Sequence, residues 1–130
     1  MREKIILSFL AFFFACAGPR AQYSAFTQRF LNDLEHVQRE NGASVLDASL
    51  KAKYLVRDSD QGEVVHGFLY VTPEFDPQSL ERLGVQIQSQ SGEICTAVIP
   101  VRSLRKLSRV KGITYIEINS PLQKSNEALL

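Results

Sequence analysis

The sequence predicts a small α+β domain, and three features support this prediction. A stripe of apolar residues at helical spacing runs through residues 24–41. Segments of alternating or continuous apolar residues, bounded by turn residues, indicate strands at 64–72, 85–90, 93–99 and 113–118. Shorter helical patterns between the strands cover 77–83 and 102–111.

The first predicted helix carries its apolar stripe on Phe26, Phe30, Leu31, Leu34 and Val37. Ser24 or Thr27 can cap its N-terminus, and Asn41-Gly42 ends it. The following residues, 43–52, fit either a short helical turn or an irregular connector. A short strand is expected at 53–57 and a turn at 58–62.

From Val64 onward the predicted order is strand, helix, strand, strand, helix, strand. This order is that of the ferredoxin-like βαββαβ arrangement, an antiparallel sheet with two helices on one face, here with an additional N-terminal helix. Asp76-Pro77 begins the first of the two helices. Leu104, Leu107 and Val110 lie on one side of the second, and Gly112 suits the left-handed residue that ends it. Because both crossovers are right-handed, we expect the first and last strands of the motif to be neighbours at the centre of the sheet.

Alternation along the strands predicts two different faces of the sheet. The helix-covered face takes Val65, Leu69, Val71, Ile116 and Ile118, opposite Leu80, Leu83, Leu104 and Leu107. The other face carries Phe68, Tyr70, Tyr115 and Glu117. Neither crossover helix covers that second face, which leaves the helix at 24–41 as its only candidate cover. A carboxylate among apolar residues there indicates a docking surface.

The N-terminal residues are typical of a secretory signal peptide, which we assign to residues 1–21. Residues 1–4 are charged and 5–17 are apolar, and this apolar run is short for a membrane span. Ala15 and Ala17 give one cleavage option, and a cut near Ala21 is another. The chain is therefore expected to be exported to the periplasm, the cell surface or the medium.

Membrane attachment would require lipidation of Cys16, which the bulky Phe14 disfavours. Removal of the signal peptide leaves Cys95 as the remaining cysteine, so no internal disulfide is expected. We expect Cys95 to be a buried packing residue.

The formal net charge of +1 provides no electrostatic footprint for nucleic acid. His36 and His66 have no second ligand at metal spacing, so neither a metal nor a cofactor is expected. Asp58, Asp60 and Glu63 fit turn chemistry, and the sequence contains no phosphate-binding glycine loop. An acylphosphatase-type enzyme would need an arginine–asparagine anion site, which the sequence does not place. The chain is not expected to be an enzyme.

The segment Leu104-x-x-Leu107-x-x-Val110-x-Gly-Ile-x-Tyr-Ile-Glu117 resembles the end of subtilisin-type protease propeptides. Upstream, the chain is similar to the fervidolysin-like N-terminal prodomains of secreted bacterial subtilases. The similar segments are Phe30-Leu31-Asn-Asp-Leu34, Gly67-Phe-Leu-Tyr-Val71, Leu83-Gly-Val and Ser91-Gly-Glu-Ile-Cys-Thr-Ala. The resemblance covers about residues 24–122.

The resemblance implies a domain that assists folding of a subtilisin-like serine protease and then inhibits it through the open sheet face. Glu117 is the matching carboxylate that caps helix N-termini of the protease, and the segment from Ser120-Pro121-Leu122 is the tail that lies in its cleft. Asn119 replaces the usual second carboxylate, so that contact should be weaker. The expected partner-binding residues are Phe68, Tyr70, Tyr115, Glu117, Asn119, Ser120, Pro121 and Leu122.

The expected organisation is a signal peptide at 1–21, an N-terminal helix and connector at 22–52, a ferredoxin-like inhibitor domain at 53–119 and an extended tail at 120–130. The printed chain contains no catalytic domain after the tail, so it is expected to be a stand-alone inhibitor or the remnant of a truncated subtilase precursor. A secreted interaction or structural module with a non-protease partner is the alternative.

Overall fold

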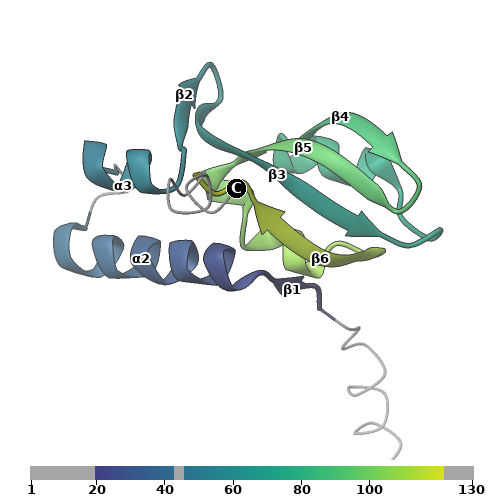
Figure 1. Cartoon of the computed structure of the whole chain (residues 1–130), viewed down its shortest axis with the longest axis horizontal. Helices are drawn as coiled ribbons and strands as arrows, with labels where there is room; N and C mark the ends of the chain where they lie inside the picture. The colour runs from purple at the N-terminus through teal and green to yellow at the C-terminus, as the bar shows by residue number, and fades with distance from the viewer. Residues whose placement is uncertain (1–19, 43–45, 122–130) are drawn as a thin grey trace, which may run out of the picture.

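The computed structural model describes residues 20–42 and 46–121, which form a sheet with helices at one end and short 3-10 turns on one face (Figure 1). The helices and strands in chain order are β1 (Gln22–Tyr23), α2 (Ala25–Asn41), α3 (Ala48–Lys53), β2 (Arg57–Ser59), β3 (Gly62–Val71), η1 (Pro77–Leu83), β4 (Gln86–Ser91), β5 (Ile94–Pro100), η2 (Val101–Ser103), η3 (Lys106–Arg109) and β6 (Ile113–Ile118). The α+β class is as predicted.

The sheet has the strand order β1-β6-β3-β5-β4, and β2 pairs with the start of β3. β3 is hydrogen-bonded to β6 on one side and to β5 on the other, antiparallel in both cases. The first and last strands of the predicted motif are therefore neighbours, as expected. The order β6-β3-β5-β4 is compatible with a ferredoxin-like arrangement. β4 is the polar edge strand, and it carries a register shift between Ile87 and Ser89.

Strand β1 was not predicted, and it joins the N-terminal segment to the same sheet. Gln22 and Tyr23 pair in parallel with Tyr115 and Ile116. A two-residue strand has no periodicity to detect, and its partner lies more than ninety residues away in sequence. The Tyr23 hydroxyl donates to the carbonyl oxygen of Leu104 at 2.9 Å. The segment before α2 is thus tied to both β6 and the turns beneath it.

Ala21, which we assigned to the signal peptide, belongs to the folded domain. It is 7% exposed, and its amide donates to the Ser108 carbonyl at 2.9 Å. The proposed division at residue 53 also separates parts that share a core. Phe30 and Leu31 of α2 lie in one cluster with Leu69, Leu107 and Ile116. The N-terminal helix and the sheet are one packing unit.

Helix α2 begins and ends as predicted, with Ser24 as its N-cap. The Ser24 Oγ accepts from the Thr27 amide at 3.1 Å. Thr27 Oγ1 accepts from the Ile118 amide at 2.9 Å, which attaches the first turn of α2 to β6. This contact is made at the backbone edge of β6. Helix α2 therefore lies beside the sheet and does not cover its second face.

The predicted strand at 53–57 was wrong. Residues 48–53 form α3, capped by the Asp47 carboxylate, and the strand that pairs with β3 starts at Arg57. The run Tyr54-Leu55-Val56 explains the error, because aromatic and β-branched residues next to one another are typical of a strand. In the fold its ring packs at 4.5 Å from the Phe30 ring, measured between centroids. Tertiary packing decided this segment.

The two crossover segments are 3-10 helices and turns rather than the amphipathic α-helices that we predicted. In 102–111, two short 3-10 segments, η2 and η3, are separated by a turn. A 3-10 helix has three residues per turn, so a spacing of three places Leu104 and Leu107 on the same side. Both are fully buried, as are Leu80, Leu69 and Ile116, and the predicted core face is confirmed. Gly112 has a φ of 89°, the left-handed conformation expected of it.

Candidate functional site

The second face of the sheet remains uncovered by the part of the chain that the structure describes. We call the following residues the open face: His66, Phe68, Tyr70, Ile94, Thr96, Val98, Tyr115 and Glu117. Phe68 is 37% exposed and Ile94 is 40% exposed, and the other members are partly buried. The 3-10 turns lie behind the sheet in Figure 1, on the opposite face. An apolar surface of this kind is typical of an interaction site.

Strand pairing gathers four of the predicted site residues into one group. Phe68 lies opposite Glu117, and Tyr70 lies opposite Tyr115 on the same two strands. The rings of Tyr70 and Tyr115 meet edge to face with centroids 5.2 Å apart. On the other side of β3, Phe68 lies opposite Thr96 and Tyr70 opposite Ile94. The aromatic residues therefore form the centre of the face, with Glu117 at its β6 side.

Glu117 is a carboxylate presented on this face and partly exposed. None of the ion pairs among the described residues includes it. Its position depends on a close approach of two backbones. A Cβ atom on Gly67 would lie 2.5 Å from the Glu117 carbonyl oxygen. The glycine thus allows β6 to run close to β3 at the residue that carries the carboxylate.

The predicted tail leaves the sheet directly after β6. The Asn119 amide donates to the His66 carbonyl at 2.8 Å, which continues the pairing beyond the strand. Ser120 and Pro121 are exposed and have no regular structure, whereas Leu122 lies outside the described residues. The structure therefore brings Asn119 to the end of the open face, next to His66.

A small hollow of about 180 Å³ lies at this end of the open face. It is lined by Leu55, Arg57, His66 and Asn119. Three of these residues, Leu55, Arg57 and His66, were not among the predicted partner-binding residues. Leu55 and Arg57 come from the segment between α3 and β3, where the sequence pattern predicted a strand at 53–57. Arg57 and Asn119 are far apart in the sequence, and only the fold brings them to the same hollow.

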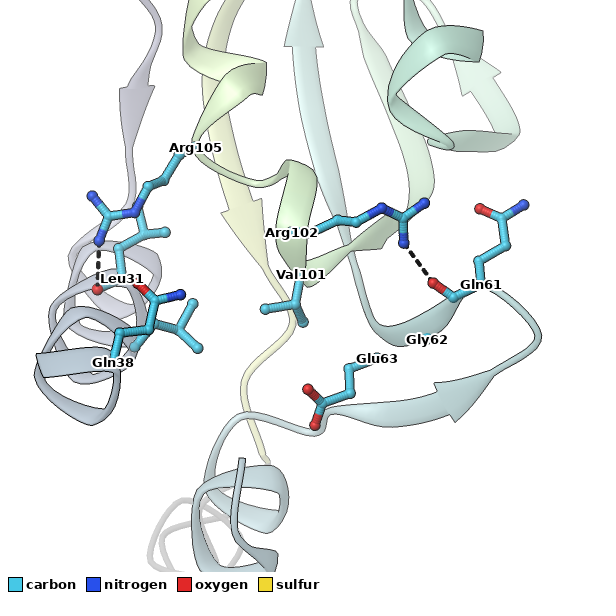
Figure 2. A pocket seen from close by; sticks show the side chains of 9 residues that line it. Leu31, Gln38, Gln61, Gly62, Glu63, Val101, Arg102 and Arg105 are labelled. Carbon is cyan, nitrogen blue, oxygen red and sulfur yellow. Dashed lines mark hydrogen bonds between the residues drawn. The ribbon is translucent and has the colours of Figure 1, made fainter. Parts of the chain in front are cut away.

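A second hollow of about 280 Å³ lies between α2, the β2–β3 turn and η2 (Figure 2). Its two arginines point in different directions. Arg102 donates to the Gln61 carbonyl, and Arg105 donates to the Leu31 carbonyl at 3.0 Å. The Glu63 carboxylate in this hollow lies 3.5 Å from the Lys51 ammonium. Since both arginines bind the chain itself, their role here is to join elements of the fold.

The surroundings of Cys95 and His36 indicate structural roles for both residues. Cys95 is fully buried, as expected, and this burial raises the pKa of its thiol, so the nucleophilic thiolate is disfavoured. His36 lies on the outer surface of α2, 3.2 Å from Glu40. Within residues 20–42 and 46–121, His, Cys, Asp and Glu form no group of three that could hold a metal ion. Across the same residues, no helix is long and apolar enough to cross a membrane.

Comparison with known proteins adds no assignment to these observations. No protein-family model, curated protein or solved structure matches the chain. The features of this chain that bear on function are therefore the open face, its carboxylate and the segment that leaves it.

Proposed function

We propose that this chain is an exported, propeptide-like domain that binds and inhibits a subtilisin-type serine protease. The observation that carries the proposal is the open face, where Phe68, Tyr70 and Tyr115 lie beside Glu117. Among the described residues, Glu117 forms no ion pair. The N-terminal signal sequence supports export, and the resemblance of the segment 104–117 to subtilase propeptides supports the class of partner.

The aromatic centre of the open face supplies the apolar contact. Tyrosine and phenylalanine bury a large area for few rotatable bonds, and aromatic residues are enriched at protein interfaces. Two of the rings, those of Tyr70 and Tyr115, are already in edge-to-face contact in the free domain. Binding therefore orders few additional side-chain torsions.

The Glu117 carboxylate supplies the directional contact. Exposed amides at the N-terminus of a partner helix carry partial positive charge, and a carboxylate placed there contributes about 0.5–2 kcal/mol. Asn119 offers a neutral amide at the position where the resemblance expects a second carboxylate. We expect one strong cap from Glu117 and at most a weak one from Asn119.

Inhibition is assigned to the segment from Ser120 onward. A chain that lies extended in a protease cleft adds backbone hydrogen bonds as an extra strand does. Asn119 still pairs with His66, so the segment starts from a fixed point at the end of the open face. Pro121 favours an extended conformation at Ser120. The face provides affinity and the tail blocks the substrate site.

The direct test is an inhibition assay of the exported, purified chain against a panel of secreted subtilases. Peptide hydrolysis should fall with increasing inhibitor, and a chymotrypsin-fold serine protease serves as the control. Glu117→Gln should weaken inhibition by about three- to thirtyfold, which corresponds to one lost helix cap. Glu93→Gln, in the exposed turn between β4 and β5, is the matched control and should leave inhibition unchanged.

Absence of binding to every subtilase in the panel would overturn the proposal. It would favour an exported interaction module whose partner is not a protease. Equal inhibition of the chymotrypsin-fold protease would also contradict it, because the proposed contacts are specific for helix N-termini of a subtilase.

A further inference from the structure

Leu55 has a backbone conformation that the described part of the chain otherwise shows only at glycines. Its φ is 54°, in the left-handed region. Among the described residues, the other positions with positive φ are glycines: Gly42, Gly62, Gly84, Gly92 and Gly112. For a residue with a branched side chain this conformation is unfavourable, because Cβ approaches the carbonyl oxygen too closely.

The hydrogen bonds around Leu55 show why the backbone takes this conformation. α3 ends at Lys53, and the Val56 amide donates to the Lys51 carbonyl at 2.8 Å. This is the long bond of a Schellman motif, in which the residue after the C-cap is left-handed and is usually glycine. Leu55 occupies that position. Helix α2 also ends at a left-handed residue, and there it is Gly42.

The leucine side chain gains little from the domain itself. Leu55 is 42% exposed, whereas Tyr54 and Val56 on either side are buried. Glycine at this position would satisfy the same motif without strain and without exposing an apolar side chain. Strained backbone that is retained at an exposed position is characteristic of functional sites.

The surroundings of Leu55 connect it to the open face. It lines the 180 Å³ hollow together with His66, which belongs to the open face, and Asn119, where the tail begins. Arg57 on the same hollow adds a guanidinium group, and His66 and Asn119 add further polar groups. The hollow thus combines the apolar side chain of Leu55 with hydrogen-bonding groups, at the point where the open face meets the tail.

We propose that Leu55 and its hollow extend the docking surface, and that Leu55 inserts against an apolar side chain of the protease next to the cleft entrance. The partner residue beside it carries a carboxylate or carbonyl oxygen that accepts from Arg57. This inference rests on the proposed function, because the protease is the partner to which it commits. In the proposed complex, Leu55 makes an apolar contact that is absent from the free domain.

The test compares Leu55→Gly with Leu55→Met in the exported full chain. Leu55→Gly relieves the backbone strain, so its thermal unfolding midpoint should equal or exceed that of the unmodified protein. Its inhibition constant for a subtilase that the unmodified protein inhibits should rise about tenfold or more, because an apolar contact is lost. Leu55→Met keeps an apolar side chain of similar size and should retain the inhibition constant within about twofold.

Three results would overturn the inference. Unchanged inhibition by Leu55→Gly, while Tyr115→Glu weakens it, would leave the open face as the docking surface and remove Leu55 from it. A midpoint lowered as much as in the core variant Leu69→Ala would make Leu55 a structural residue. A dimer of the unmodified chain in sedimentation that Leu55→Gly converts to monomer would assign the hollow to a second copy. Failure of the unmodified protein to bind any subtilase is a separate result, which defeats the proposed function as well.

Discussion

A methyl group on Gly67 would lie 2.5 Å from the carbonyl oxygen of Glu117 and 3.0 Å from Cα of Ile118. The central strand therefore needs a glycine where the last strand passes closest to it. Glu117 is the only carboxylate of the open face. The position of the proposed binding carboxylate therefore depends on how closely β3 and β6 pack at Gly67.

Gly67→Ala should destabilise the domain and weaken binding together. Overpacking of a tight contact costs about 1–3 kcal/mol, and β6 must shift at Glu117 to relieve it. Chemical denaturation measures the first effect, and protease inhibition measures the second. Gly92→Ala is the control, because a Cβ atom there meets nothing within 4 Å and only its φ of 58° is unfavourable. A smaller loss of stability in Gly67→Ala than in Gly92→Ala would contradict the role of the close approach.

Tyr115→Glu should weaken protease binding far more than it lowers stability. Tyr115 lies at the centre of the open face, in contact with Tyr70, and it is not part of the buried core cluster. Thermal unfolding and binding measured on the same variant separate the two effects. Leu69→Ala is the comparison, since removal of a fully buried leucine costs about 2–5 kcal/mol of stability. Proportional losses of stability and binding in Tyr115→Glu would mean that this residue is ordinary core.

Removal of residues 120–130 should separate binding from inhibition. The sheet ends at Ile118 and Asn119 keeps its bond to His66, so the shortened chain should fold. It should still bind a subtilase weakly through the open face, but lose most of its inhibition of peptide hydrolysis. Calorimetry and a peptide-hydrolysis assay measure the two properties. Full inhibition by the shortened chain would rule out the tail mechanism and leave steric blocking by the sheet.

Tyr54 should make the fold sensitive to alkaline pH. Burial raises the pKa of its hydroxyl well above the usual range, and the hydrogen bond that it donates to Asp33 adds to this effect. The unfolded chain releases this proton near pH 10, where the folded domain still holds it, so stability should fall as pH rises above about 10. The hydrogen bond of Lys51 with Asp58 raises the lysine pKa and acts in the same direction.

Tyr54→Phe should lose about 1.5–3 kcal/mol of stability at neutral pH, the contribution of a hydrogen bond to a charged group. Its stability should also decline less steeply above pH 10. Denaturant unfolding at pH 7, 9, 10 and 11 measures both, with Tyr70→Phe as the matched control on the open face. An identical alkaline slope in Tyr54→Phe would show that other groups govern this pH range.

Cleavage of the predicted signal peptide should leave a protein that begins upstream of Ala21. Cleavage after Ala21 would remove a residue that is 7% exposed and the amide that binds Ser108. Cleavage after Ala17 keeps both and follows the small residues at Ala15 and Ala17. Mass spectrometry of the exported chain should find Gly18 at the N-terminus. A protein that begins at Gln22 would contradict this prediction, because cleavage would then have removed the Ala21 amide that binds Ser108.

The sequence by itself determined the elements whose residues repeat over several turns or strand positions. The stripe of α2, the alternation of β3 and β6 and the leucines at 104 and 107 reflect local periodicity, which is read without knowledge of any neighbour. For the same reason Phe68, Tyr70, Tyr115 and Glu117 were placed on one face before their contacts were known. The spacing of three in 102–111 could not distinguish an α-helix from 3-10 turns, because both bring such residues to one side.

Only the tertiary structure decided the segments whose conformation depends on distant partners. β1 exists because β6 offers it a backbone edge, and α3 exists where Tyr54 can pack against Phe30. The left-handed Leu55 is set by the hydrogen bond from Val56 to Lys51, and its neighbours in the hollow come from β2, β3 and the end of β6. Local propensity would have placed glycine there, so only the folded chain shows that an exposed leucine is held beside the start of the tail.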